Sequence, residues 1–130
     1  MAVNKAGDVY LSSHLEIYRV ESGTGLILRV AGYGFIGSRD GSAATARFAD
    51  IAGLAMDDSN TLYITDLKVL RKLSGGIVST AASLEYASGV AIDESGNTYV
   101  AQTEKNNVVK VSSGAVVSIF GKCFSRRWLK

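Results

Sequence analysis

An oxygen-bearing side chain recurs at the same place in three parts of the sequence, as Asn4, Asp57 and Asp93. Oxygen ligands of this kind can gather around a hard cation such as calcium. The same side chains can instead accept hydrogen bonds from the backbone of a turn that follows them. Because a turn requirement predicts such a residue in every repeat, we interpret all three as turn caps and predict no metal site.

His14 is the only histidine, and it follows Ser12 and Ser13 directly, with Glu16 nearby. Catalytic triads bring these residue types together in space. A single imidazole cannot supply a three-histidine zinc site. We interpret His14 as a residue of a surface loop and predict no catalytic residue and no cofactor.

Two further patterns suggest a chemistry that their surroundings do not support. Cys123, the only cysteine, has Lys122 as its one cationic neighbour in sequence, so we interpret it as a tail thiol and not as a nucleophile. Residues 32–37 match the spacing of a dinucleotide-binding glycine motif. That motif needs the helix of a βαβ unit after it, and the sequence predicts none, so we interpret the run as a loop.

Composition and charge exclude several classes of protein. The 130 residues carry a net charge of +2, and their hydrophobic content of 47% is typical of a globular domain. Four basic residues, Lys122, Arg126, Arg127 and Lys130, lie in the last nine positions. Without them ten basic side chains stand against twelve acidic ones, so no domain-wide nucleic-acid surface is indicated. No run of about 18 apolar residues is present, so no membrane-spanning helix is predicted.

The sequence repeats itself over residues 1–10, 54–63 and 90–99. Each segment has an Asn or Asp six residues before a Tyr, which predicts a strand, a tight turn and a second strand. The turn position holds Gly7, Asn60 and Gly96, and these residue types tolerate positive φ most readily. The first and second repeats are farther apart in sequence than the second and third. The additional residues form a glycine-rich connector, residues 32–48.

Two more strands are predicted after each of these segments. The third strands are expected at residues 17–20, 69–73 and 108–111, with their basic residues on the solvent side, and the fourth at 26–31, 77–82 and 115–120. Four short strands per repeat, joined by Gly, Asn and Ser turns, are typical of β-propeller blades. The sequence therefore predicts an all-β fold of about three four-stranded antiparallel blades.

The third repeat carries the closest likeness to a known family. It reads Asp93-Glu94-Ser95-Gly96-Asn97-Thr98-Tyr99-Val100-Ala101, followed by Asn106-Asn107-Val108-Val109-Lys110-Val111. This order of acid, Gly-Asn turn, aromatic-apolar strand, Asn-Asn turn and basic-apolar strand resembles the NHL repeat of β-propellers. The connector segments 31–34, 39–43 and 46–48 also resemble the long linker between blades in that family.

The resemblance implies one repeat domain, residues 1–122, with a basic tail at 123–130. Its expected parts are blade 1 at about 1–32, a connector at 33–53, blade 2 at about 54–88 and blade 3 at about 89–122.

Three blades cannot close a ring, because propellers use about 4 to 8 blades. Met1 stands where a blade begins, so the sequence predicts an open or half-size propeller. Unpaired terminal blades expose apolar faces, which predicts self-association. A homodimer that completes a six-blade ring is therefore one expected partner.

The leading functional hypothesis is a non-enzymatic binding scaffold that holds a protein partner on its loops. The connector supplies the expected contact residues Tyr33, Phe35, Arg39 and Asp40, because tyrosine and arginine are common interface anchors. One alternative is a fragment of a propeller lyase or lactonase. The family that the sequence resembles includes lyases with histidine-rich metal centres. This sequence lacks the residues of those centres.

RNA binding is the second alternative. Basic residues of the third strands could form a stripe, namely Arg19, Arg71, Lys72 and Lys110. Acidic residues lie close to them in sequence, so a mixed-charge solvated rim is favoured over an RNA surface. Residues 126–130 combine cations with Trp128, a pattern found in nucleic-acid and membrane-surface contacts, and we interpret them as a chain end.

Overall fold

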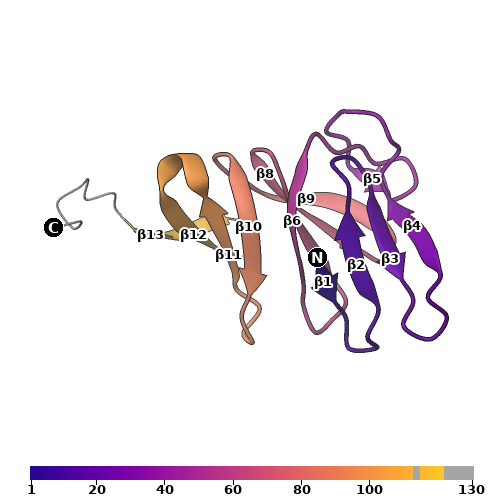
Figure 1. Ribbon diagram of the computed structural model, residues 1–130. Helices are drawn as coiled ribbons and strands as arrows, with labels where there is room; N and C mark the ends of the chain where they lie inside the picture. The colour runs from indigo at the N-terminus through magenta and orange to yellow at the C-terminus, as the bar shows by residue number, and fades with distance from the viewer. Residues whose placement is uncertain (113–114, 122–130) are drawn as a thin grey trace, which may run out of the picture.

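The computed structural model describes residues 1–112 and 115–121, which form three antiparallel sheets standing side by side (Figure 1). Each sheet contains a four-stranded meander in which successive strands pair. Within the described residues, helical structure is limited to a 3-10 turn, η1 (Thr103–Lys105). No helix in that part of the chain has the length and apolarity to cross a membrane. The prediction of an all-β fold built from four-stranded antiparallel blades is confirmed.

The strands follow the predicted order. The first sheet contains β1 (Ala2–Val3), β2 (Val9–Ser12), β3 (Ile17–Val20) and β4 (Ile27–Ala31). The second contains β6 (Ile51–Met56), β7 (Leu62–Asp66), β8 (Val69–Ser74) and β9 (Ile77–Ser83). The third contains β10 (Ala87–Ile92), β11 (Thr98–Gln102), β12 (Asn107–Ser112) and β13 (Ala115–Phe120). We refer to these sheets as blades 1, 2 and 3.

A fifth strand, β5 (Gly41–Ser42), belongs to the connector between blades 1 and 2 and pairs with the outer strand β9. The connector also folds back on itself, because Arg39 and Arg47 exchange backbone hydrogen bonds of 3.1 Å in both directions. It is therefore built onto the edge of blade 2 by backbone pairing.

The turns between the first and second strands share one geometry. The φ angles are +91° at Gly7, +62° at Asn60 and +83° at Gly96. The Asp57 carboxylate accepts the backbone N–H of Ser59 at 2.9 Å. The Asp93 carboxylate accepts the backbone N–H of Ser95 in the same way at 2.9 Å, and the side-chain Oδ1 of Asn4 accepts the Asp8 N–H at 3.0 Å. Side-chain acceptors thus satisfy turn donors that the strands leave unpaired.

The core lies between the blades. One buried cluster joins Ile17 and Ala31 of blade 1 to Phe48 of the connector and to Leu54 and Leu62 of blade 2. A second cluster joins blades 2 and 3; it consists of Leu70, Ala82, Leu84, Ala87, Val100, Val109 and Val111. Because the apolar sheet faces that lie between neighbouring blades cover each other, the blades stabilise one another by face-to-face burial.

One expectation about the third strands is wrong. Arg71 was expected on the solvent side, but its side chain is fully buried. The cross-strand pairs Tyr10–Arg19, Tyr63–Lys72 and Tyr99–Lys110 show that Lys72 holds the repeated basic position. Since neighbouring residues of a strand point to opposite faces, Arg71 points into the protein. The proposed basic stripe therefore loses one of its members.

Candidate binding surface on the first connector

The connector between blades 1 and 2 lies at the end of the blades that also carries the β2–β3 and β7–β8 turns (Figure 1). We call this end the loop end. Gly32 begins the connector, with φ +100°, and a Cβ there would lie 2.5 Å from the carbonyl oxygen of Leu15. The connector thus starts in close backbone contact with the β2–β3 turn.

Two aromatic rings of the connector lie in contact on the surface, tilted by 39° to each other. The ring centroids of Tyr33 and Phe35 are 5.4 Å apart, and the residues are 47% and 61% exposed. The Arg47 guanidinium lies 5.7 Å from the Tyr33 centroid and 5.8 Å from that of Phe35. We call Tyr33, Phe35 and Arg47 the aromatic patch. Cation–π contacts of this kind hold rings in place without covering their outer faces.

The buried Arg71 anchors the connector beneath this patch. Its guanidinium donates to Asp66 at 3.1 Å, to Asp40 at 2.8 Å and to the backbone oxygen of Arg47. It also lies 4.7 Å from the ring centroid of Phe48. One side chain of blade 2 thereby fixes three positions of the connector, including a member of the aromatic patch.

Asp66 extends this anchor to the end of the connector. Its carboxylate accepts the backbone N–H groups of Ala49 at 2.9 Å and Asp50 at 2.7 Å. The Asp66 side chain is fully buried, and so is that of Arg71, its partner. A buried carboxylate with one guanidinium and two N–H donors is a satisfied site, whose disruption is costly.

Asp40 links the connector to the rest of blade 2. Its carboxylate accepts from Arg71 at 2.8 Å and from the Thr80 hydroxyl at 2.8 Å. Partial burial pushes the pKa of Asp40 upward, but the hydrogen bonds from Arg71 and Thr80 outweigh it, so this pKa lies below its ordinary value. The charged form of Asp40 is therefore the form that the fold favours.

The four connector residues expected from the sequence take different positions. Tyr33 and Phe35 belong to the exposed patch, whereas both carboxylate oxygens of Asp40 are engaged inside the chain. Arg39 is an exposed residue whose backbone pairs with that of Arg47. Arg47 was not assigned to a site from the sequence, and Arg71 was assigned only to the alternative basic stripe, because only their position in space reveals these contacts.

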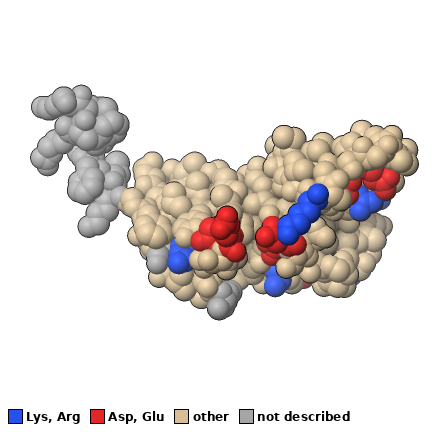
Figure 2. All heavy atoms as spheres, turned by 90° about the horizontal axis from the view of Figure 1, so that it is seen from below, with Lys and Arg blue, Asp and Glu red and all other residues tan. Residues whose placement is uncertain are grey.

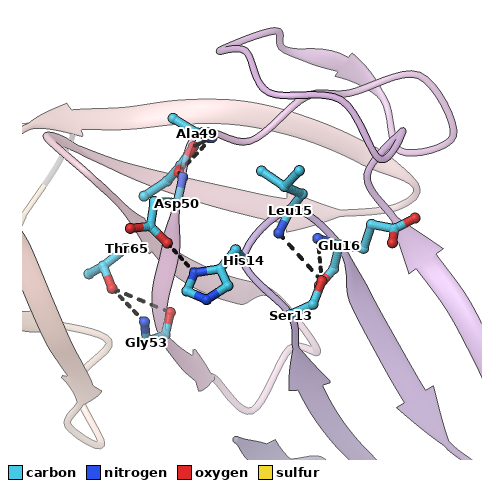
Figure 3. Close-up of polar contacts among 9 residues, drawn as sticks. Ser13, His14, Leu15, Glu16, Ala49, Asp50, Gly53 and Thr65 are labelled. Carbon is cyan, nitrogen blue, oxygen red and sulfur yellow. Dashed lines mark hydrogen bonds and ion pairs between the residues drawn. The ribbon is translucent and has the colours of Figure 1, made fainter.

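His14 and Asp50 meet at the same end of the molecule (Figure 3). The imidazole Nδ1 lies 2.6 Å from Asp50 Oδ1, and the His14 side chain is 85% exposed. The backbone carbonyl of His14 accepts the N–H of Ile51 at 2.8 Å. This pair therefore joins the β2–β3 turn of blade 1 to the start of blade 2.

The neighbouring Ser13 does not take part in a triad with His14. Its hydroxyl oxygen accepts the N–H of Glu16 at 3.2 Å and of Leu15 at 3.4 Å (Figure 3). Thr65, drawn in the same view, accepts the Gly53 N–H at 2.8 Å. These hydroxyl groups organise turns and strands and make no contact with the imidazole in the described part of the chain.

Acidic and basic side chains both lie at the opposite end of the blades (Figure 2). A depression of about 300 Å³ there is lined by the turns that contain Asp57, Asp58, Asp93 and Glu94. Asp58 approaches Lys5 at 3.8 Å, with both side chains largely exposed. Among the described residues, no group of three or more His, Cys, Asp or Glu side chains is arranged to hold a metal ion. Cys123 and the basic residues of the tail lie outside the described residues.

Comparison with solved structures places the fold among β-propellers. The chain is 13% identical to a catalytically inactive virginiamycin B lyase from Staphylococcus aureus with quinupristin, with a TM-score of 0.71 over 94% of this chain. An auxiliary nutrient binding protein from Bacteroides thetaiotaomicron is 16% identical, with a TM-score of 0.68 over 81%. The Dos1 propeller is 13% identical, with a TM-score of 0.58 over 92%.

These neighbours establish the fold alone, because their sequences are distant. The chain spans 40%, 34% and 32% of the lengths of the lyase, the nutrient binding protein and the Dos1 propeller, respectively. No protein-family model matches the sequence, and no curated protein is significantly similar to it. The neighbours include both a binding protein and enzymes, so the function has to be argued from this chain's own site.

Proposed function

We propose that this chain is a propeller-type binding module that captures a protein partner on the aromatic patch and Arg39 without catalysing a reaction. The observation that carries this proposal is the exposed Tyr33–Phe35 pair, held by Arg47 on an anchored connector. Exposed aromatic side chains with a neighbouring arginine are the usual anchors of protein interfaces. We also propose that the blades are of the NHL type.

Rigidity of the connector supports this assignment. Binding costs less entropy when the contact residues are already ordered. Here β5 pairs with β9, and Arg71 holds the backbone of Arg47 and the carboxylate of Asp40. In this proposal Tyr33, Phe35 and Arg39 contact the partner, and Asp40 keeps the connector in place.

Selection of ligands from a random peptide library tests the proposal. Peptides selected on the natural chain are then measured against Tyr33→Ala/Arg39→Ala and against a control, Leu26→Ser/Ile27→Ser, which changes exposed apolar residues of the β3–β4 region. We expect the first variant to weaken binding at least about tenfold, the effect of losing one interface anchor. Equal affinity for that variant and the natural chain would contradict the proposal.

A second copy of the chain, the homodimer expected from the sequence, is the alternative partner. Apolar side chains are exposed on the outer faces of both terminal blades, including Ile27 at 66% in blade 1 and Phe120 at 49% in blade 3. Light scattering on a size-exclusion column checks this part of the proposal. A species of twice the 13.7 kDa chain mass would agree with two half rings, and a monomer at every concentration would contradict them.

A lyase activity is the second candidate function, favoured by the His14–Asp50 pair. A carboxylate on Nδ1 leaves Nε2 as the free, basic nitrogen, which is the arrangement of a general base. Incubation with quinupristin, followed by liquid chromatography and tandem mass spectrometry, tests this candidate. Cleavage that disappears in His14→Gln would support it, and unchanged quinupristin would remove it.

A further inference from the structure

Each blade presents the same pair of positions on its third and fourth strands. The register pairs Ile17 with Ala31 in blade 1, Leu70 with Ala82 in blade 2 and Val108 with Phe120 in blade 3. We call each pair a blade socket. Since the three pairs occupy equivalent positions, the chain contains three sockets that can be compared directly.

The first two sockets are filled from within the chain. Phe48, three residues before β6 begins at Ile51, is buried in the cluster that contains Ile17 and Ala31. Leu84, three residues before β10 begins at Ala87, is buried with Leu70 and Ala82. We call residues 48–53 and 84–89 the lead-in segments. Both have a large apolar residue first and a glycine last.

The lead-in segments also make the same backbone contact. Ile51 N–H donates to the carbonyl of His14 at 2.8 Å, and Ala87 N–H donates to that of Leu67 at 2.8 Å. His14 and Leu67 occupy the same position of the repeat: His14 follows Ser13 in blade 1, and Leu67 follows Asp66 in blade 2. The equivalent residue of blade 3 is Thr103, the first residue of η1. A lead-in segment is thus recognised by one apolar side chain and one N–H group.

The close approach of blade 3 to blade 2 explains the final glycine. A Cβ on Gly53 would lie 2.7 Å from the carbonyl oxygen of Ser88 and 3.4 Å from the Cα of Gly89. Gly89 occupies the equivalent position in β10, and a Cβ there would meet nothing within 4 Å. Gly89 of blade 3 therefore has the position at which Gly53 lets the next blade approach closely, but no neighbouring strand lies beside Gly89 among the described residues.

The third socket is open among the described residues. Val108 is 38% exposed and Phe120 is 49% exposed, whereas their counterparts Leu70 and Ala82 are 0% and 7% exposed. A depression of about 510 Å³ is lined by Ala101, Thr103, Val108 and Phe120 together with polar residues of the same turn. Val108 and Phe120, which line this depression, are equivalent to the residues that are buried in the two filled sockets.

We propose that the third socket binds a lead-in segment carried by another polypeptide: an extended stretch with a large apolar residue, a small or branched apolar residue three positions later, and a glycine two positions after that. Its apolar side chain packs between Val108 and Phe120, and the N–H of its fourth residue donates to the Thr103 carbonyl. In a second copy of this chain the two lead-in segments of the described residues are already held by that copy's own sockets, because Phe48 and Leu84 are buried there, so neither is free to occupy the third socket. This surface is separate from the aromatic patch.

A peptide with the sequence of residues 82–92 is the probe for this site. The peptide is titrated to about 1 mM into the isotope-labelled chain, and backbone amide shifts are followed by NMR. We expect saturable shifts at Thr103 and Val108. A control peptide in which its leucine, the counterpart of Leu84, is aspartate should bind at least about tenfold more weakly, because the apolar burial is lost.

Two chain variants separate this site from a general loss of folding. Val108→Asp should abolish the shifts, and Ile119→Asp should retain them, because Ile119 pairs with the buried Val109 and lies on the other face of the sheet. The absence of saturable shifts in a monomeric natural chain would overturn the proposal. A dimer that Val108→Asp dissociates would overturn it as well, since the socket would then hold a second copy of the chain.

Discussion

Arg71 and Asp66 form an ion pair of 3.1 Å in which neither side chain is exposed to solvent. The pair does more than join two neighbouring strands, because each partner also binds the connector. Arg71 holds Asp40 and the Arg47 backbone, and Asp66 holds the N–H of Asp50. The position of the aromatic patch thus depends on two fully buried residues beneath it.

Replacing Arg71 should destabilise the chain strongly. In Arg71→Met the Asp66 carboxylate stays buried without its counter-ion, and loss of one partner of a buried pair costs about 3–5 kcal/mol. Urea denaturation followed by circular dichroism measures the free energy of unfolding. The control Arg39→Met should change it by less than about 0.5 kcal/mol, because Arg39 is exposed. Similar effects of the two substitutions would contradict the anchoring role of Arg71.

The contribution of Asp40 should depend on pH in a definite direction. Its pKa in the folded chain lies below the ordinary value, so the stabilisation is present above about pH 4 and is lost as the pH falls through the folded pKa. The difference in unfolding free energy between the natural chain and Asp40→Asn should be constant from about pH 5 to 7 and should shrink below about pH 4. A difference in unfolding free energy that grows as the pH falls would contradict a lowered pKa for Asp40.

Two equivalent glycines should respond differently to alanine. Gly53→Ala places a Cβ against the carbonyl oxygen of Ser88 and should cost about 1–3 kcal/mol, as overpacking does. Gly89→Ala meets open space and should leave the stability within about 1 kcal/mol of the natural value or raise it slightly. Thermal unfolding of both variants provides the comparison. An equal loss in both would mean that the approach of blade 3 to Gly53 is not what constrains this position.

Removing the aromatic patch should affect binding without affecting the fold. Tyr33 and Phe35 are largely exposed, so the double variant Tyr33→Ser/Phe35→Ser should unfold within about 1 kcal/mol of the natural chain. Phe48→Ser provides the contrast, because its ring is fully buried and its loss should cost about 3–5 kcal/mol. A large loss of stability in the patch variant would identify these rings as part of the core.

The blades could be predicted from the sequence because their signals are local. The recurring Asn or Asp, the turn residue and the tyrosine at fixed spacing located β2, β7 and β11, and the alternation of apolar residues located the outer strands. β5 could not be found in this way, since a two-residue Gly-Ser strand has no alternating pattern. Arg71 was misplaced because blade 2 lies between two other blades, so neighbouring residues on opposite faces of β8, Leu70 and Arg71, are both fully buried.

The binding surface was only partly accessible from the sequence. Its exposed aromatics lie in the connector as expected, but their support from Arg47 and Arg71 comes from residues 12 to 38 positions away from them in the chain. The equivalence of Phe48 and Leu84 was also hidden. Phe48 follows the end of its preceding fourth strand, Ala31, by 17 residues, whereas Leu84 directly follows Ser83, so the sequence spacing differs while the packing is the same.

The most direct test of the binding proposal is the hydrogen-exchange footprint of a peptide selected on the natural chain. If the connector is the binding surface, backbone amides of residues 33–47 should exchange more slowly in the complex, and the turns that contain Asp57 and Asp93 should be unchanged. Protection confined to those turns, with no change in the connector, would contradict the account.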